Sequence, residues 1–200
     1  MIKEKLLEVT EQVRASLKPT DIISVDEAKN IIARYTAAVE GNFLAWMGAA
    51  VIYARSPQGE YAAKENLGVE LKDNHQGMLR GFAKSAEAEP SLEHYQKVNE
   101  VVSSMRNFFS KENGLQALTV MATLEHTSSI FIPYLAELAE KRGSKNLRYT
   151  DIHGEADIEH AKQFIWAVES ELKLHDNAER KIDQAIGKTL TFLAEIFTKK

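Results

Sequence analysis

The sequence predicts an all-α protein of seven or eight helices that forms a single domain over residues 1–200. Apolar residues recur at helical spacing through most of the chain, and no segment alternates apolar and polar residues with period two. Only four Pro and ten Gly interrupt the 200 residues, and most of them stand between the periodic stretches. These observations favour long helices over strands, and the length fits one domain.

Four helices are predicted in the first half of the chain. An apolar stripe with helical spacing defines the first, which ends before Pro19: Ile2, Leu6, Val9, Val13 and Leu17. Ser24 and Glu27 form a capping box that opens a helix extending to Arg55, where the turn sequence Ser-Pro-Gln-Gly begins. A helix over 60–71 follows, then a break at 72–74 and a further helix to about residue 87.

Four more helices are predicted in the second half. One starts at Pro90-Ser91 and ends at Asn113-Gly114. A long apolar helix over 116–141 is expected to kink at Pro133, and another helix covers 147–174. The last helix has a stripe of residues expected to be buried: Ile182, Ile186, Leu190, Leu193 and Phe197.

The composition excludes several classes of function. The formal charge of −4 lacks the basic excess of nucleic-acid binding proteins. Cys is absent, which removes disulfides, thiolate-bound metals and thiol nucleophiles. The charged N-terminal residues MIKEKLLEVTEQ do not form a signal peptide, and the apolar run 39–54 is too short to span a membrane. We therefore expect a cytoplasmic protein whose metal ligands, where it has any, are His, Asp or Glu.

The strongest candidate for a functional site is the segment H-G-E-A-D-I-E-H. On a helix its His153, Asp157 and His160 fall within roughly 60° of one another. One helical face then presents imidazole, carboxylate and imidazole, which suits iron or manganese. A solvated polar face is the alternative interpretation. The apolar stripe beside these residues indicates that they border the core.

Two carboxylates stand in strongly apolar surroundings. Glu40 opens the run V-E-G-N-F-L-A-W-M-G-A-A-V, and Glu125 has no Lys or Arg for several residues on either side. A buried carboxylate costs several kcal/mol unless a cation compensates, so each predicts either a metal ion or a salt bridge. His126 points about 100° away from Glu125, and Glu125 is predicted to be the inward residue.

A third segment, K-E-N-L-G-V-E-L-K-D-N-H, contains Glu65, Glu70 and His75. On spacing alone it is typical of a solvated stretch. One carboxylate and one His from it would complete a set of four carboxylates and three imidazoles. Four carboxylates balance the charge of two divalent ions, as a site in a protein interior requires.

The stretch Y-T-D-I-H-G-E-A-D-I-E-H resembles the H-x3-D-x2-H signature of haem-oxygenase-like diiron oxidases and oxygenases, relatives of the thiaminase and quinone-cofactor-biosynthesis bundles. N-L-G-V-E resembles the N-L-x-x-E element of that family, and Glu40 fits the Glu of its first helix. The resemblance spans residues 30–175. It implies an up-and-down helical bundle with two iron ions, Fe(II) or Fe(III), and O2 as co-substrate.

The resemblance carries over a set of metal ligands, with Glu65 in reserve for Glu70: Glu40, Glu70, His75, Glu125, His153, Asp157 and His160. Glu70 and His75 depart from a regular pattern, since five residues place them about 140° apart on an unbroken helix. A helix break near 72–74 would resolve this conflict.

The implied activity is oxidation of a small organic substrate, an amino acid or amine, by N-oxygenation or oxidative bond cleavage. Oxidative decarboxylation of a fatty acid on the same bundle is an alternative, and a non-catalytic helical interaction protein is an alternative of another class. An electron donor and a homodimer are further expectations. Two related branches are not expected. The thiaminase branch needs a catalytic Cys, which the chain lacks, and a haem oxygenase needs a His early in the chain, whereas the first here is His75.

Some residues are candidates for the substrate pocket. Aromatic residues that line it or simply pack in the core are Tyr35, Trp46, Tyr149 and Trp166. Arginines that could anchor a substrate carboxylate, or lie at the surface, are Arg34, Arg55 and Arg106. His94 and His175 are in polar surroundings and are predicted to lie at the surface.

Overall fold

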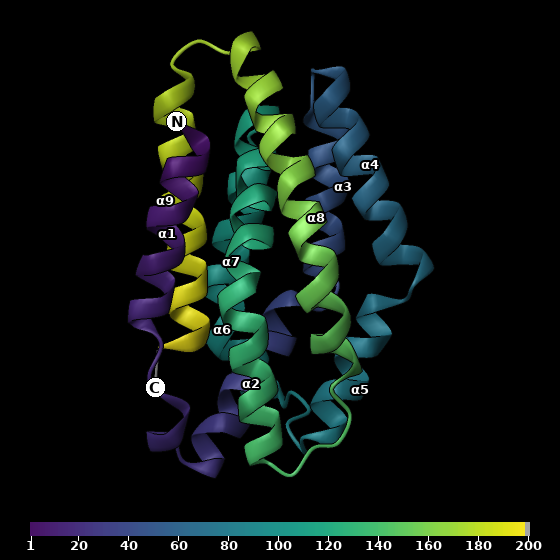
Figure 1. The fold of residues 1–200 in the computed structure, drawn as a ribbon, viewed down its shortest axis with the longest axis vertical. Coiled ribbons are helices and arrows are strands. Elements are labelled where there is room, and N and C mark those ends of the chain that lie inside the picture. The colour runs from purple at the N-terminus through teal and green to yellow at the C-terminus, as the bar shows by residue number, and fades with distance from the viewer. Residues whose placement is uncertain (199–200) are drawn as a thin grey trace.

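The computed structural model describes residues 1–198, and it confirms the all-α prediction, with no strand in this part of the chain. The helices form an elongated bundle (Figure 1). The α-helices are α1 (Ile2–Ser16), α2 (Val25–Val39), α3 (Asn42–Tyr53), α4 (Pro57–Lys72), α5 (His75–Ser85), α6 (Leu92–Phe109), α7 (Gly114–Lys141), α8 (Arg148–Glu171) and α9 (Ala178–Phe197). Two short 3-10 turns cover Thr20–Ile22 and Leu172–Leu174.

Helix α7 is the central element of the bundle. It is apolar on almost every face, and most of its residues are buried, as expected for a helix with neighbours on all sides. It packs most extensively against α8 and also contacts α1, α3 and α9. Figure 1 shows α7 between the α1–α9 pair and α8. A side chain on the α8 side of α7 therefore points into the interior of the molecule.

The predicted helix from Ser24 to Arg55 is in fact two helices. Ser24 caps the first by accepting a hydrogen bond from the Glu27 backbone N–H at 3.1 Å, as predicted. Glu40 then ends α2, and Gly41 adopts φ +73°, a left-handed conformation that glycine tolerates best. The break at Gly41 raises the number of α-helices in the described residues to nine, from the predicted seven or eight. It also leaves Glu40 at the C-cap of α2, outside the regular helix.

The Asn113-Gly114 pair begins a helix instead of ending one. Helix α6 stops at Phe109, and the Asn113 side chain accepts a hydrogen bond from the Gln116 backbone N–H, which makes it the N-cap of α7. Helix α7 continues through Pro133. The other predicted helices agree with the structure to within a few residues. None of the helices in residues 1–198 is long and apolar enough to cross a membrane.

Glu171, at the end of α8, joins three elements. Its carboxylate is fully buried and accepts hydrogen bonds from the backbone N–H groups of Arg55 and Ser56, at 2.7 to 3.1 Å. His175 also contacts it, at 3.2 Å, and has a side chain only 4% exposed. The prediction that His175 lies at the surface is therefore wrong, because the turn after α8 folds it back against Glu171.

We predict that Gly114→Ala destabilises the protein by about 1–3 kcal/mol, the usual cost of overpacking a closed interior site. A Cβ at this position would lie 2.2 Å from the Tyr53 carbonyl oxygen and 2.6 Å from Glu171 Oε1. Gly187→Ala is the matched control, because a Cβ there meets nothing within 4 Å. This control should gain up to about 1 kcal/mol from helix propensity. Urea unfolding measures both, and equal free energies of unfolding for the two variants would contradict the assigned close approach.

Candidate metal centre

One face of α8 presents three ligand-type side chains to the interior. His153, Asp157 and His160 are only 7%, 5% and 6% exposed. Their spacing of four and three residues keeps them on one side of the helix, facing α7. The solvated polar face that the interaction-protein alternative requires is not what the structure contains.

Three more side chains approach from α4, α5 and α7. Glu125 lies on the face of α7 that meets α8 and is buried, whereas His126 is half-buried, as the sequence predicted. Glu70 and His75 are also buried. Helix α4 ends at Lys72, and Asn74 takes the left-handed φ of 54°, so the chain turns between them. This turn brings His75 Nδ1 to 2.7 Å from Glu70 Oε1 despite the awkward five-residue spacing.

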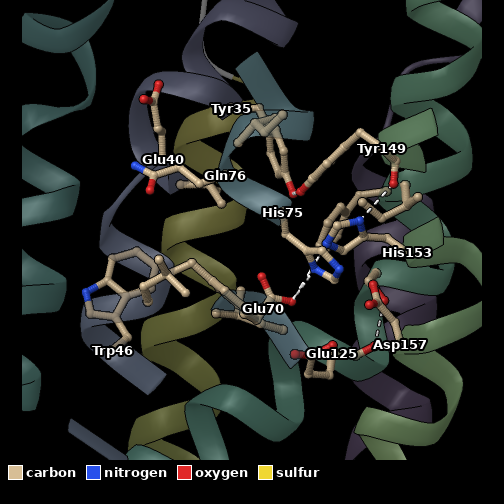
Figure 2. Close-up of a pocket in the computed structure, with 18 of the residues that line it drawn as sticks. Tyr35, Glu40, Trp46, Glu70, His75, Gln76, Glu125, Tyr149, His153 and Asp157 are labelled. Atoms are coloured by element: carbon tan, nitrogen blue, oxygen red, sulfur yellow. Dashed lines mark hydrogen bonds and ion pairs between the residues drawn. The ribbon is translucent and has the colours of Figure 1, made fainter. Parts of the chain in front are cut away.

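The six side chains form two adjacent groups. Figure 2 labels Glu70, His75 and His153 of the first group and Glu125 and Asp157 of the second. Within each group the potential ligand atoms lie within 4.8 Å of one another. The first group contains Glu70, His75 and His153, with His153 Nε2 at 3.9 Å from Glu70 Oε1. Two His and one carboxylate are the facial ligand set of non-haem iron sites.

The second group contains Glu125, Asp157 and His160. His160 Nδ1 lies 3.6 Å from Glu125 Oε2 and 3.9 Å from Asp157 Oδ1. These separations are too long for hydrogen bonds and suit atoms that share a central ion. The donor set of two carboxylates and one imidazole is that of an iron or manganese site.

Unpartnered polar atoms show that the site fits metal ions. Buried polar atoms normally have hydrogen-bond partners, and each one without a partner needs an explanation. Four such atoms belong to these groups: His75 Nε2, Glu125 Oε1, Asp157 Oδ1 and His160 Nδ1. A cation beside them would satisfy lone pairs that the protein leaves unused.

The tautomer of His153 is set by its surroundings. Its Nδ1 donates a hydrogen bond to the Tyr149 carbonyl oxygen at 2.8 Å. The other ring nitrogen, Nε2, then carries a lone pair directed at the Glu70 side of the site, as a metal-binding imidazole requires. The Tyr149 hydroxyl is in turn hydrogen-bonded to the Tyr35 hydroxyl at 2.7 Å. This chain of contacts fixes the orientation of the His153 ring.

Burial shifts the titration of the site strongly in the protein without bound metal. It raises the pKa of Asp157 to about 9, an effect that the neighbouring charge of Glu125 increases. Burial also raises the pKa of Glu125 well above its ordinary value. It lowers the pKa of His153 to about 4 and lowers that of His160. Ligands so costly to ionise are typical of a functional site.

Two of the residues that the sequence proposed are placed elsewhere. Glu40 belongs to neither group, because its carboxylate forms an ion pair with Arg80 instead. Its apolar neighbours predicted burial, but the break at Gly41 leaves its side chain 14% exposed at the edge of the pocket. Glu65 is exposed, so Glu70 is the carboxylate that α4 contributes.

A cavity of about 60 Å³ adjoins the two groups. Apolar residues form most of its wall, and Tyr35, Trp46 and Tyr149 line it, whereas Trp166 lies exposed elsewhere. Glu40 and Gln76 lie at the end opposite the two groups (Figure 2). None of Arg34, Arg55 and Arg106 lines it. Arg34 instead donates a hydrogen bond to the Ile196 carbonyl, and Arg106 donates to the Asn42 side-chain oxygen.

Sequence reasoning missed Ser128, Gln76 and Arg80. Ser128 lines the cavity one helical turn after Glu125 and contributes to keeping the pKa of Asp157 from rising further. Because residues three apart are neighbours on one helical face, the spacing from Glu125 could have identified this serine as a residue of the site. Gln76 directly follows His75, but Arg80 meets Glu40 only through the packing of α5 near the end of α2, which no local pattern records.

The fold and the site together define a helical bundle with a buried cluster of oxygen and nitrogen donors that could hold metal ions. A family model described as iron-containing redox enzyme, of the haem-oxygenase-like type, matches residues 33–193. The chain belongs to this family, and the match includes all six side chains of the site. The family resemblance predicted from the motifs is thus confirmed, and the protein is a redox enzyme on a haem-oxygenase-like bundle.

Comparison with curated proteins and comparison with solved structures gave no match.

We predict that metal binding releases protons and that the protein prepared without metal loses stability as the pH rises from about 6.5 towards 9. In this range folded Asp157 keeps its proton up to about pH 9, whereas an unfolded Asp, with an ordinary pKa of 3.8, is ionised. The unfolded state then binds fewer protons, so the free energy of unfolding falls by up to about 1.4 kcal/mol per pH unit for each such group. Bound metal replaces the proton and removes this slope.

The test is thermal unfolding across that pH range with and without Mn(II), together with calorimetry in buffers of different ionisation enthalpy. Below 6.5 the lowered pKa of His153 acts in the opposite direction, because the unfolded chain then binds the extra proton. Asp157→Asn is the control that should reduce the slope, with the remaining slope due to Glu125. Metal binding without proton release would contradict the prediction.

Proposed function

We propose that the protein is an O2-activating oxidoreductase that holds two iron ions and acts on a small amino acid or amine. The observation that carries this proposal is the pair of adjacent, buried ligand groups with four unpartnered polar atoms. Membership in a family of iron-containing redox enzymes supports iron as the metal.

Under this proposal each ligand group holds one ion. Glu70, His75 and His153 would hold the first, and Glu125, Asp157 and His160 the second. Three donors per ion leave coordination positions open, as oxygen-activating sites need. Bound iron would supply the electrons that reduce O2 next to the substrate.

The surrounding side chains position the ligands and exclude water. His153 is held by the Tyr149 carbonyl, and Ser128 donates a hydrogen bond to the Glu125 carbonyl oxygen at 2.6 Å. Asn66, one turn before Glu70, donates to the Gln163 side chain at 2.7 Å and so joins α4 to α8. Such contacts around the ligands fix geometry, and the apolar cavity wall keeps the reacting centre dry.

The size of the cavity supports a small substrate. A volume of about 60 Å³ has room for about four to six water-sized groups, at about 10–15 Å³ each. A long-chain fatty acid exceeds this space. This limit favours the amino acid or amine over the fatty-acid alternative.

The experiment that tests the function is anaerobic loading with Fe(II), followed by metal analysis and exposure to O2. We expect about two iron ions per chain and a transient change in visible absorption when O2 is added. Iron bound at less than one ion per chain, with no optical change, would refute the proposal and favour the interaction protein.

Two Glu→Gln variants of α4 separate the ligand from its neighbour. We predict that Glu70→Gln weakens iron binding by more than the roughly 10- to 100-fold loss typical of residues that merely contact a ligand. Glu65→Gln is the matched control and should bind iron like the unmodified protein, because Glu65 is exposed. Equilibrium competition with a chelator measures both affinities. Equal iron affinity in the two variants would exclude Glu70 as a ligand.

A further inference from the structure

The end of the cavity opposite the metal groups has its own arrangement of polar groups. Glu40 and Gln76 line this end (Figure 2). Glu40 forms an ion pair with Arg80 of α5. The Gln76 side chain is half-buried and makes no hydrogen bond to any of the described residues. The Arg80 guanidinium, which is not part of the cavity wall, thus reaches this mouth of the cavity through its contact with Glu40, and the free Gln76 amide lies at the same end.

This ion pair is available to a ligand. The Arg80 side chain is 63% exposed, whereas that of Glu40 is 14% exposed. Exposed salt bridges contribute only about 0–1 kcal/mol, since water screens the charges and the side chains lose freedom. An incoming molecule that carries both charges can replace each partner without leaving either charge unpaired.

Between this mouth and the metal groups the wall offers few free polar groups. The Tyr35 and Tyr149 hydroxyls bind each other, and the Ser128 hydroxyl is directed at the Glu125 carbonyl. The remaining lining is apolar apart from the Trp46 indole Nε1, a buried donor without a hydrogen-bond partner among the described residues: Val39, Phe43, Leu44, Trp46, Leu79, Leu124, Phe131, Ile132, Phe192 and Leu193. The cavity thus suits a molecule with a charged head at the mouth and a short apolar chain that points to the metal groups.

We propose that the mouth recognises the zwitterionic head of an α-amino acid, with Glu40 binding the ammonium group and Arg80, helped by Gln76, binding the carboxylate. The side chain of that amino acid is apolar and about four carbons long, which agrees with the room in the cavity. This inference rests on the proposed function for the role of the inner end. It assigns Glu40 to substrate binding instead of metal binding.

Three related probes separate the two charges. L-Norleucine carries both charges on a four-carbon side chain, n-pentylamine lacks its carboxylate and hexanoate lacks its ammonium group. Calorimetric titration of the Fe(II)-loaded protein under argon should give the tightest binding with norleucine. We expect pentylamine and hexanoate each to bind at least about tenfold more weakly, the usual loss for one charged hydrogen bond. Hexanoate or pentylamine binding as tightly as norleucine, or norleucine failing to bind, would overturn the proposal.

Variants at the mouth identify the residues. Glu40→Gln should lower the affinity for norleucine and pentylamine at least about tenfold and leave hexanoate binding no weaker. Arg80→Ala should lower the affinity for norleucine and leave pentylamine unchanged. Glu93→Gln, which breaks the exposed Glu93–Lys97 pair of α6, is the matched control without effect. Unchanged norleucine affinity in Glu40→Gln, with a native circular dichroism spectrum, would refute the assignment.

Iron content keeps this test separate from that of the proposed function. Glu40→Gln should bind as much iron as the unmodified protein, because Glu40 lies in neither ligand group. Full iron content with no norleucine binding refutes the amino-acid head alone. Loss of iron from Glu40→Gln would also refute it, since Glu40 would then be the metal ligand that the sequence motifs implied.

Discussion

The cost of burying ionisable groups is the constraint on which the rest of the structure depends. Three carboxylates and three imidazoles lie side by side in the interior, each less than a tenth exposed. Removing one such ion from water costs several kcal/mol unless it is compensated. The raised pKa of Asp157 and the lowered pKa of His153 express the same cost. Helices α7 and α8 hold these groups together because their extensive apolar packing offsets the hydration free energy that the six side chains lose on burial.

Rigid helices and hydrogen bonds fix the relative positions of these six side chains. The four ligand-type side chains on α7 and α8 stand within long α-helices, and a hydrogen bond to the Tyr149 carbonyl holds the His153 ring. The remaining two stand on either side of the turn at Asn74, where α4 passes into α5. The Asn66–Gln163 hydrogen bond ties that side of the site to α8. Most of the geometry thus follows from helix packing, and one turn completes it.

Helical periodicity explains how much the sequence could predict. His153, Asp157 and His160 belong to one helix, so their common face follows from local spacing alone. The contact between Glu70 and His75 depends on the left-handed backbone conformation of Asn74. The polar residues at 72–74 indicated a helix break there but not its conformation. The ion pair of Glu40 with Arg80 is the salt-bridge alternative that its apolar neighbours predicted, but the sequence could not name the partner, because it lies 40 residues away. Such long-range pairing depends on tertiary packing, which no local pattern encodes.

Glu40 lines the cavity but belongs to neither ligand group, so the two ends of the cavity differ in their physical requirements. Metal chemistry needs a dry site, since water would compete for open coordination positions and weaken every electrostatic interaction there. The proposed recognition of a charged head suits a position near solvent, because the ligand keeps part of its hydration and its own charges take the places of Glu40 and Arg80 in their ion pair. The break at Gly41 keeps the charged mouth apart from the buried ligand groups, because α2 ends before Glu40 and this side chain stays at the edge of the cavity. A continuous helix from Ser24 to Arg55 would have removed the left-handed turn that places this carboxylate at the mouth.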